Sequence, residues 1–145
     1  MDFAKAFDKV PPKKLIRKLR EYREQRIESF LHQRQQRVVC EGEMSSWVPE
    51  TSGVPQGSVI GPILFLVYIN DLLDKVQSKV RLFADDTIVY MAVTNENDAA
   101  ILQKDLKLLE EWENRLQMSF HPYKCNVLRV TRNRNPLTHD YILHN

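Results

Sequence analysis

The sequence predicts an α+β fold in which antiparallel strands form a sheet and helices pack on one face of it. Residues 38–48 and 80–93 are rich in strand-forming side chains and are each interrupted by a short turn, which is typical of hairpins. A single helical face is indicated by apolar residues that recur at steps of four, three, three and four, namely Leu102, Leu106, Leu109, Trp112 and Leu116. The predicted order is therefore helix, hairpin, helix, hairpin, helix, strand.

The first half of the chain predicts two helical segments and a hairpin. Pro12 suits the first turn of a helix, and residues 15–19 supply an apolar stripe above basic neighbours. Residues 27–34 continue a helical pattern. In the hairpin, residues 38–39 form one arm, the turn lies near Glu41 and Gly42, and residues 47–48 form the other arm.

The second half begins with a loop punctuated by Gly and Pro, which leads into a helix from Ile63 to Leu73 with Pro62 at its start. That helix is apolar on nearly all sides, so we expect it to be largely buried. Residues 80–93 are expected to form two strands around a turn at Asp85 and Asp86. Asn97 or Asn95 would cap the next helix, and strands are expected after Lys124 and at residues 141–143.

Length and composition bound the class of protein. The 145 residues, 43% of them apolar, suffice for one compact domain, and the net charge of +2 identifies no partner. Neither a signal peptide nor an apolar run long enough to span a bilayer is visible, so we expect an intracellular, soluble protein without a membrane partner. Cys40 and Cys125 stand outside any CxxC or Cys/His cluster, which argues against structural zinc and leaves a disulfide open.

Basic residues are concentrated at the start of the chain. Residues 1–37 contain eleven Lys or Arg against five acids, a balance of +6. A phosphate backbone is one partner that such a region fits, and a solvated helix face is the alternative.

Two adjacent carboxylates, Asp85 and Asp86, interrupt an otherwise apolar strand pattern. Ordinary use of Asp in a turn is one explanation. A third acid, Asp2, lies at what looks like a strand end. If the three meet, their repulsion would be costly unless cations neutralise it. Oxygen ligands select hard cations, so Mg²⁺ is the expected ion and Mn²⁺ a substitute.

The stretch "SGVPQGS" at residues 52–58 is a second candidate element. Its glycines allow unusual backbone conformations, and Gln56 offers an amide that can contact a base or sugar. A plain loop before a buried helix is the alternative. Phe7, five residues after Asp2, could block a ribose 2′-hydroxyl sterically, although core packing is the commoner role of Phe.

Four stretches carry a resemblance to a known family: "DFAKAFD", "SGVPQGSVIGPILFLVYINDL", "RLFADDT" and "WENRLQMSFHPYKCNVL". Their order and approximate spacing resemble the reverse transcriptase domain of non-LTR (LINE-type) retrotransposons, most like the jockey-type group. The resemblance covers Asp2 to about Arg132. It implies the palm of a right-hand polymerase over residues 1–135, followed by a polar tail at 136–145.

The resemblance also implies roles for individual residues. Asp2 and Asp85 would be the principal metal ligands, with Asp86 completing the acidic turn and the backbone carbonyl of Phe3 as a further ligand. Lys124 would protonate the leaving pyrophosphate, although a surface lysine on a turn is the alternative. The residues that would line the nucleotide and template pocket are Phe7, as the sugar-selecting ring, Gln56 and Gly57.

The parent reaction that the resemblance implies is RNA-templated addition of deoxynucleotides to a DNA primer by two-metal catalysis. The fingers and thumb segments of the family have no counterpart in this sequence, and Tyr22 runs almost directly into "REQRIESFL", which suggests a short internal deletion. We therefore expect the isolated chain to be inactive. The alternative is a non-catalytic remnant that acts only as a weak nucleic-acid-binding or interaction module. The sequence leaves the oligomeric state open.

Overall fold

The computed structural model describes residues 1–22 and 26–144 and divides the chain into two compact units. One unit comprises residues 1–6 and 69–145, and the other comprises residues 7–68. Two members of the basic region, Arg23 and Glu24, lie outside the described residues, as does the junction at which the sequence suggests a deletion.

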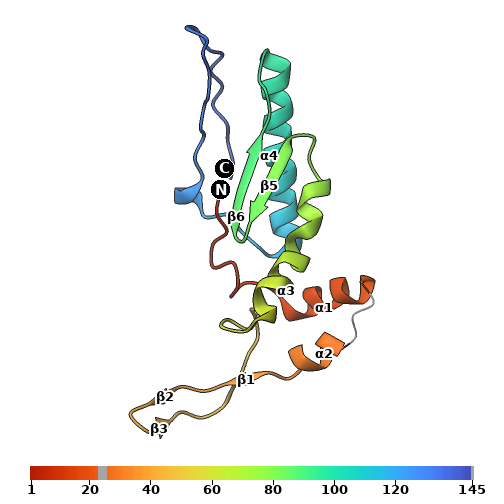
Figure 1. Ribbon diagram of the computed structural model, residues 1–145, viewed down its shortest axis with the longest axis vertical. Helices are drawn as coiled ribbons and strands as arrows, with labels where there is room; N and C mark the ends of the chain where they lie inside the picture. The colour runs from red at the N-terminus through yellow and green to blue at the C-terminus, as the bar shows by residue number, and fades with distance from the viewer. Residues whose placement is uncertain (23–25, 145) are drawn as a thin grey trace. The chain divides into compact units, whose positions relative to one another are not determined.

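Two helices open the unit of residues 7–68 (Figure 1). Helix α1 spans Pro12–Glu21 and begins with Pro at its first position, as predicted; α2 spans Arg26–Leu31. Leu15 and Leu19 of α1 are buried. The Lys18 ammonium donates to the backbone carbonyl of Tyr68 and lies 5.0 Å from the centre of its ring, so part of the positive charge of α1 is used within the fold.

A hairpin is present with its turn where predicted, but it forms two short antiparallel ladders in which Val39 pairs with Met44 and Val48 pairs with Gln36, so the predicted arms 38–39 and 47–48 are not each other's partners. Strands β1 (Gln35–Gln36) and β4 (Val48–Pro49) pair with each other, as do β2 (Val39–Cys40) and β3 (Glu43–Met44). Positive φ angles at Glu41 and Gly42 close the turn where the sequence places it. All eight strand residues are exposed, so this hairpin adds little to the core.

Helix α3 spans Ile60–Ile69 and continues as the 3₁₀ helix η1, Asn70–Asp74. It starts three residues before the predicted Ile63, because the Ser58 hydroxyl accepts from the Gly61 amide and satisfies a free N–H of the first turn. The expectation that this helix is largely buried is met only in part. Leu64 and Phe65 are buried, but Ile63 is 56% exposed.

The unit of residues 1–6 and 69–145 contains a second hairpin, β5 (Lys79–Phe83) and β6 (Asp86–Tyr90). Its register pairs Phe83 with Asp86. The turn is therefore Ala84–Asp85, with Ala84 in the left-handed region at φ 51°, and not Asp85–Asp86 as predicted. Asp86 is a strand residue whose side chain has a defined face.

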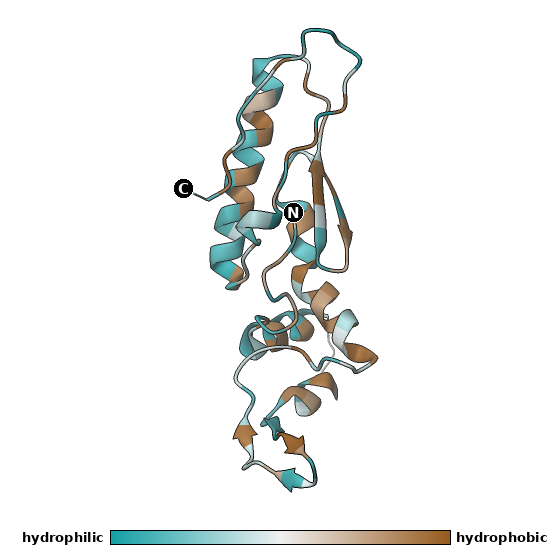
Figure 2. Cartoon of the chain, turned by 90° about the vertical axis from the view of Figure 1, so that its left-hand side faces the viewer, coloured by the Kyte–Doolittle hydropathy of each residue, from teal (hydrophilic) through white to brown (hydrophobic). Residues whose placement is uncertain are grey.

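Helix α4, Glu96–Leu116, runs along one face of this hairpin (Figure 1). Asn95 is its N-cap and forms a capping box with Asp98, which confirms one of the two predicted caps. Apolar and polar residues alternate along the helix in the manner of an amphipathic element (Figure 2). Leu109 and Trp112 are fully buried as predicted, whereas Leu102 and Leu106 are only half-buried.

After α4 the chain forms a 3₁₀ turn, η2 (Pro122–Lys124), and then runs on without regular strands. The strands expected after Lys124 and at 141–143 are therefore wrong for the described residues. Their backbones lack a ladder partner, and side chains hold the segment instead: the Gln103 amide donates to the Ile142 carbonyl at 2.8 Å and accepts from the Ile142 amide at 2.9 Å.

Residues 1–4 lie between β6 and residues 119–121. On one side Met1 exchanges two hydrogen bonds with Thr87, at 2.9 and 2.8 Å. On the other side the Ala4 amide donates to the Ser119 carbonyl at 2.7 Å. Residues 1–4 thus occupy a central position beside the hairpin. No helix in the described part of the chain is long and apolar enough to cross a membrane.

Candidate active site

The backbones of Asp2 and Asp86 lie directly opposite each other in an antiparallel bridge. The hydrogen bonds from Thr87 to Met1 and from Phe3 to Asp85 flank this pair, so it is of the non-hydrogen-bonded kind, in which opposite side chains come closest. Opposite residues project from the same face, and like charges in this position repel. The fold therefore brings together two acids that are 84 positions apart in the sequence (86 minus 2).

This acidic pair lies on the face of the hairpin away from α4. Phe3 and Thr87, the next residues along each strand, are both buried on the other face, and the Phe3 ring packs 5.9 Å from that of Trp112 in α4. Strand alternation then places Asp2 and Asp86 outward. Asp85 lies in the adjoining turn, and its backbone carbonyl accepts from the Phe3 amide at 3.3 Å.

Lys124 joins the cluster from η2. Its ammonium lies 2.5 Å from Oδ2 of Asp2. The hydrogen bond and charge of Asp2, with smaller contributions from Asp85 and Asp86, raise the pKa of Lys124. Lys124 therefore stays protonated near neutral pH and gives up its proton less readily than an ordinary lysine does.

The donor set suits a hard cation in its chemistry. The oxygens are carboxylates, and Oδ1 of Asp2 is buried without a hydrogen-bond partner among the described residues. An unsatisfied buried oxygen next to a second carboxylate is a position where positive charge would be stabilising. In the arrangement observed, no group of three His, Cys, Asp or Glu within residues 1–22 and 26–144 is placed to hold a metal ion, and the Lys124 ammonium forms an ion pair with the Asp2 carboxylate.

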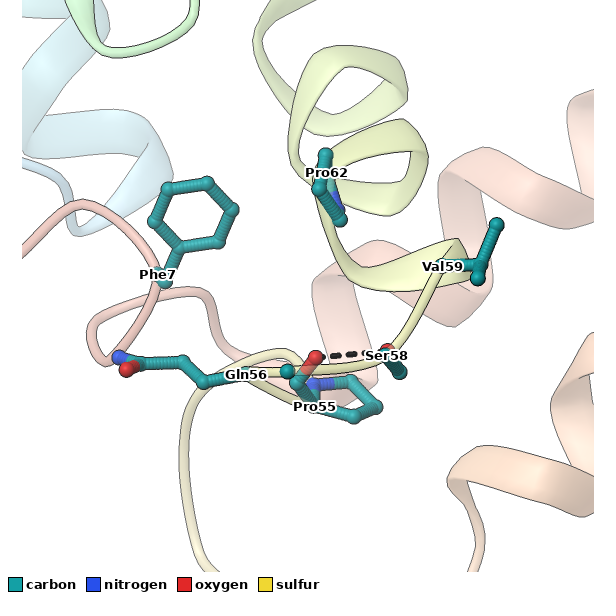
Figure 3. Close-up of a pocket in the computed structure, with 7 residues that line it drawn as sticks. Phe7, Pro55, Gln56, Ser58, Val59 and Pro62 are labelled. Atoms are coloured by element: carbon teal, nitrogen blue, oxygen red, sulfur yellow. Dashed lines mark hydrogen bonds between the residues drawn. The ribbon is translucent and has the colours of Figure 1, made fainter.

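The other predicted site residues lie in the unit of residues 7–68, around an open pocket of about 490 Å³ (Figure 3). Phe7, Gln56 and Gly57 all line it. The Phe7 ring also stacks on Phe65 at 4.9 Å, so it contributes to packing as well as to the pocket wall. Gly57 has a φ of 75°, a conformation that favours glycine.

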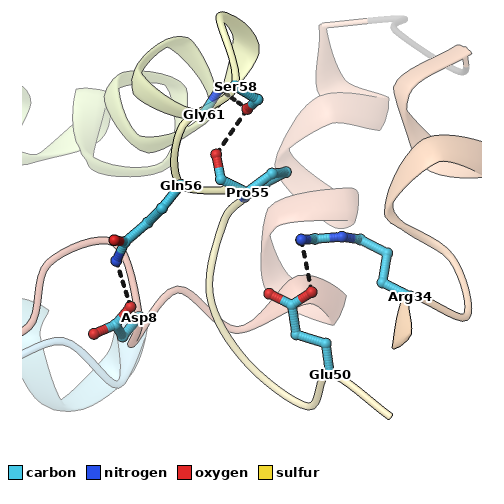
Figure 4. Close-up of polar contacts among 7 residues, drawn as sticks. All are labelled: Asp8, Arg34, Glu50, Pro55, Gln56, Ser58 and Gly61. Carbon is cyan, nitrogen blue, oxygen red and sulfur yellow. Dashed lines mark hydrogen bonds and ion pairs between the residues drawn. The ribbon is translucent and has the colours of Figure 1, made fainter. Parts of the chain in front are cut away.

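The loop that carries Gln56 is held at both ends (Figure 4). The Val54 amide donates to the Phe7 carbonyl at 2.8 Å, and the Ser58 hydroxyl donates to the Pro55 carbonyl at 2.7 Å. A Cβ on Gly53, whose φ is 96°, would lie 3.1 Å from the Phe7 carbonyl, so this close approach requires glycine. Specific contacts therefore fix the conformation of this loop, which does more than connect the chain to α3.

Three polar residues were not among the predicted ones: Asp8, beside the pocket loop, and Asp105 and Glu113 on α4. Asp8 accepts from the Gln56 side-chain amide at 2.5 Å and orients it (Figure 4). Asp105 and Glu113 are buried acids on α4. The second Asp of "DFAKAFD" was a visible signal for Asp8, but nothing local distinguishes the two acids on α4 from the exposed acids around them.

Comparison with known proteins identifies the family. The profile of the reverse transcriptase (RNA-dependent DNA polymerase) family matches residues 1–140. The chain is 32% identical to the RNA-directed DNA polymerase from mobile element jockey of Drosophila melanogaster, over 91% of this chain and 16% of that protein. It is 30% identical to the jockey enzyme of Drosophila funebris over 97% of this chain and 18% of the relative.

A further similar protein is the probable RNA-directed DNA polymerase from transposon X-element of Drosophila melanogaster, 31% identical over 74% of this chain. The chain thus spans about a sixth of the length of the jockey relatives. The match runs over nearly the whole chain and agrees with the mixed α+β fold and the antiparallel hairpin that carries the acids. The chain belongs to the reverse transcriptase (RNA-dependent DNA polymerase) family.

Proposed function

We propose that this chain is the palm part of an RNA-directed DNA polymerase that adds deoxynucleotides to a DNA primer on an RNA template. The observation that carries the proposal is the opposed pair Asp2 and Asp86, with Asp85 in the adjoining turn. Two carboxylates held face to face on the outer side of a sheet repel each other, and bound divalent cations relieve that repulsion.

Asp2, Asp85 and Asp86 would hold Mg²⁺, or Mn²⁺ in its place, with the Phe3 carbonyl as a further oxygen donor. When bound, two such cations supply the charge that activates a primer 3′-hydroxyl and stabilises the leaving pyrophosphate. Lys124, whose ammonium contacts the Asp2 carboxylate, would be the proton donor to the leaving pyrophosphate, the role that the resemblance implies for it. The hydrogen bonds on both sides of residues 1–4 hold Asp2 in position for this role.

Phe7, Gln56 and Gly57 would contact the incoming nucleotide or the template. Gln56 presents an amide whose nitrogen donates to Asp8, which leaves its carbonyl oxygen as an acceptor for a base or sugar. The Phe7 ring, fixed against Phe65, would exclude a ribose 2′-hydroxyl by steric contact.

The outer face of β5 and β6 fits a nucleic-acid strand. Phe83 is 83% exposed, and Ile88 and Tyr90 are also exposed on this face. Two exposed cations lie opposite them in the ladder: Lys79 pairs with Tyr90, and Arg81 pairs with Ile88. Apolar and aromatic side chains beside cations allow base stacking together with phosphate contact.

A second candidate function is nucleic-acid binding without catalysis. The contact between Lys124 and Asp2 favours it, because a cation at this carboxylate must compete with an ammonium that is already present. Both candidates predict nucleic-acid binding, and only the first predicts binding of divalent metal at the acidic pair.

The discriminating experiment is a titration of the 145-residue chain with Mn²⁺, followed by paramagnetic broadening of NMR signals. We expect selective broadening of the amides of residues 1–4 and 84–87, and its loss in the double variant Asp2→Asn/Asp86→Asn. The matched control is Asp74→Asn/Glu111→Gln, which removes two exposed acids from the same unit. Uniform broadening, or broadening that persists in Asp2→Asn/Asp86→Asn, would leave only the non-catalytic function.

Primer extension tests the reaction itself. We expect none from residues 1–145 alone, because alignment of the two substrates contributes roughly 7–11 kcal/mol to such reactions and depends on surfaces beyond this chain. Replacing the matching segment of the jockey polymerase with residues 1–140 should give a Mg²⁺-dependent polymerase that Asp85→Ala inactivates. Extension by the isolated chain that Asp85→Ala abolishes would show instead that the palm is self-sufficient.

A further inference from the structure

Glu113 is a buried acid that the proposed reaction does not use. Its side chain is 3% exposed on the inner face of α4. Burial raises the pKa of Glu113, and hydrogen bonds from His144 and from the Phe120 amide act in the opposite direction. A buried carboxylate is costly unless it is hydrogen-bonded, so these two contacts offset the cost of burying Glu113.

The hydrogen bond from the Phe120 amide directs the chain that follows α4. Gln117 adopts a left-handed conformation at φ 59° and ends the helix, with its amide donating to the Glu113 backbone carbonyl. The Phe120 amide then donates to the Glu113 carboxylate. One residue thus terminates the helix through its backbone and holds the next segment through its side chain.

That segment is the direct neighbour of the strand that carries Asp2. Phe120 forms an antiparallel bridge with Phe3, and their rings stack at 4.4 Å. The His121 amide donates to the Asp2 carbonyl at 2.7 Å. Lys124, which contacts the Asp2 carboxylate, follows three residues later. A continuous set of contacts therefore runs from Glu113 through Phe120 to Asp2.

The contact with His144 fixes the orientation of the Glu113 carboxylate. His144 Nε2 lies 2.6 Å from Glu113 Oε2, while the other carboxylate oxygen serves Phe120. The segment that carries His144 is held two residues earlier by the paired hydrogen bonds between Gln103 and Ile142. His144 therefore orients a group that would otherwise have one unsatisfied oxygen in the core.

We propose that Glu113 is a positioning residue for the acidic pair: it holds Phe120 against Phe3 and so fixes the register and distance of Asp2 relative to Asp86, with His144 orienting the Glu113 carboxylate. The importance of this positioning for activity rests on the proposed polymerase function. The positioning itself is a property of this chain that can be measured without activity.

The test is amide hydrogen exchange of the 145-residue chain, which reports local opening. Glu113→Ala should raise the exchange of the Phe120 and His121 amides by about tenfold or more while leaving Val89 in β6 unchanged. Glu113→Gln should restore protection at Phe120, because the amide oxygen of Gln can still accept its hydrogen bond. His144→Ala should give an intermediate increase at Phe120.

Asp105 provides a matched control. It is 1% exposed on the same helix, two turns earlier, and accepts from the Gln77 and Ser78 amides at 3.1 and 2.7 Å. Asp105→Ala should raise exchange at residues 77 and 78 and leave Phe120 protected. If Glu113→Ala and Asp105→Ala loosen the same amides, or if Phe120 stays protected in Glu113→Ala, the proposal is wrong.

Should Glu113→Ala fail to fold, Glu113→Gln and His144→Ala decide. Normal protection at Phe120 in the first and loss of it in the second support the proposal, and the reverse pattern overturns it. In the Mn²⁺ titration, His144→Ala should weaken binding severalfold and Lys104→Ala should not. If the unmodified chain binds no Mn²⁺, the proposed function fails while the exchange data still judge the positioning.

Discussion

At the scale of single residues, folding changes how readily some side chains take up or lose a proton. Asp98 is one of them. Its carboxylate accepts from the Thr94 hydroxyl at 2.6 Å and from the Thr94 amide at 2.8 Å. These hydrogen bonds and a further one from the Asn95 amide lower the pKa of Asp98. The charged form is therefore favoured in the folded chain.

A pH dependence follows from this shift. Because the folded pKa lies below the unfolded one, the stabilisation by Asp98 is complete above the unfolded pKa and is lost as pH falls through the lowered value. We expect Asp98→Ala to lower the melting temperature at pH 6 and the two proteins to converge toward pH 2. Glu111→Ala, an exposed change on the same helix, should show no such convergence. A deficit in Asp98→Ala that is constant with pH would exclude the charge as its cause.

Gln117 offers a second prediction at this scale. Its φ of 59° lies in the left-handed region, where a side chain is strained and glycine is favoured at the end of a helix. Gln117→Gly should stabilise the chain by about 0.5–1 kcal/mol in urea denaturation. Glu111→Gly, inside α4, should destabilise it by about 1 kcal/mol. Destabilisation by both changes would mean that the helix end is not the one described.

At the scale of elements, α4 shows where a periodic pattern and burial diverge. The apolar stripe predicts that its four leucines and one tryptophan are equally buried. In the structure, Leu106 is only half-buried, and the neighbouring Asp105 is buried in the N-terminal half of the helix. Asp105 is accommodated because it accepts three hydrogen bonds at the start of β5, from the amides of residues 77 and 78 and from the Ser78 hydroxyl. At this position of α4, hydrogen bonds to a buried carboxylate take the place of apolar packing.

The two ends of this face should therefore differ in stability. Leu109→Ala should cost about 2–5 kcal/mol, since Leu109 is completely buried and its removal leaves a cavity. Leu106→Ala should cost less than half as much, because water can reach the vacated space. Urea denaturation with a common slope measures both. Equal losses would refute the packing described for α4.

At the scale of the whole molecule, charge suggests how the chain meets its partners. Internal contacts use part of the basic region: Arg20 pairs with Glu28, and Arg34 pairs with Glu50 at 2.6 Å. Lys13 and Arg17 remain exposed on α1, as do Lys79 and Arg81 on the outer face of β5. Glu28 is already subtracted in the balance of +6, but Glu50 lies outside residues 1–37, so the Arg34–Glu50 pair lowers the positive charge that is available for a partner.

We expect weak binding of single-stranded RNA. The logarithm of the binding constant should fall linearly with the logarithm of the salt concentration, with a slope of about 0.7 for each phosphate contact. Lys79→Ala/Arg81→Ala and Lys13→Ala/Arg17→Ala each remove two cations and should each reduce that slope by about 1.4 if both cations contact phosphates. Lys104→Ala/Lys107→Ala, which removes two exposed charges from α4, is the control. Fluorescence anisotropy at several salt concentrations provides the measurement, and an affinity independent of salt would show that phosphates are not contacted.

The sequence by itself determined most of what depends on neighbouring residues. The α+β class, the two hairpins, α1 with Pro12 at its start, and the Asn95 cap of α4 follow from propensity, periodicity and capping, which act over a few positions. The motifs also picked out Asp2, Asp85, Asp86 and Lys124 as residues of one site, and membership of the family agrees with the motifs from which they came.

Only the tertiary structure decided which distant groups meet. The opposition of Asp2 to Asp86, the contact of Lys124 with Asp2, and the hold of Glu113 on Phe120 join segments by hydrogen bonds and packing that leave no periodic signal. The missing strands after Lys124 have the same origin, because a strand requires a partner that the local sequence cannot supply. Buried acids such as Asp105 look like surface residues until their donors, more than 25 positions away, are brought beside them.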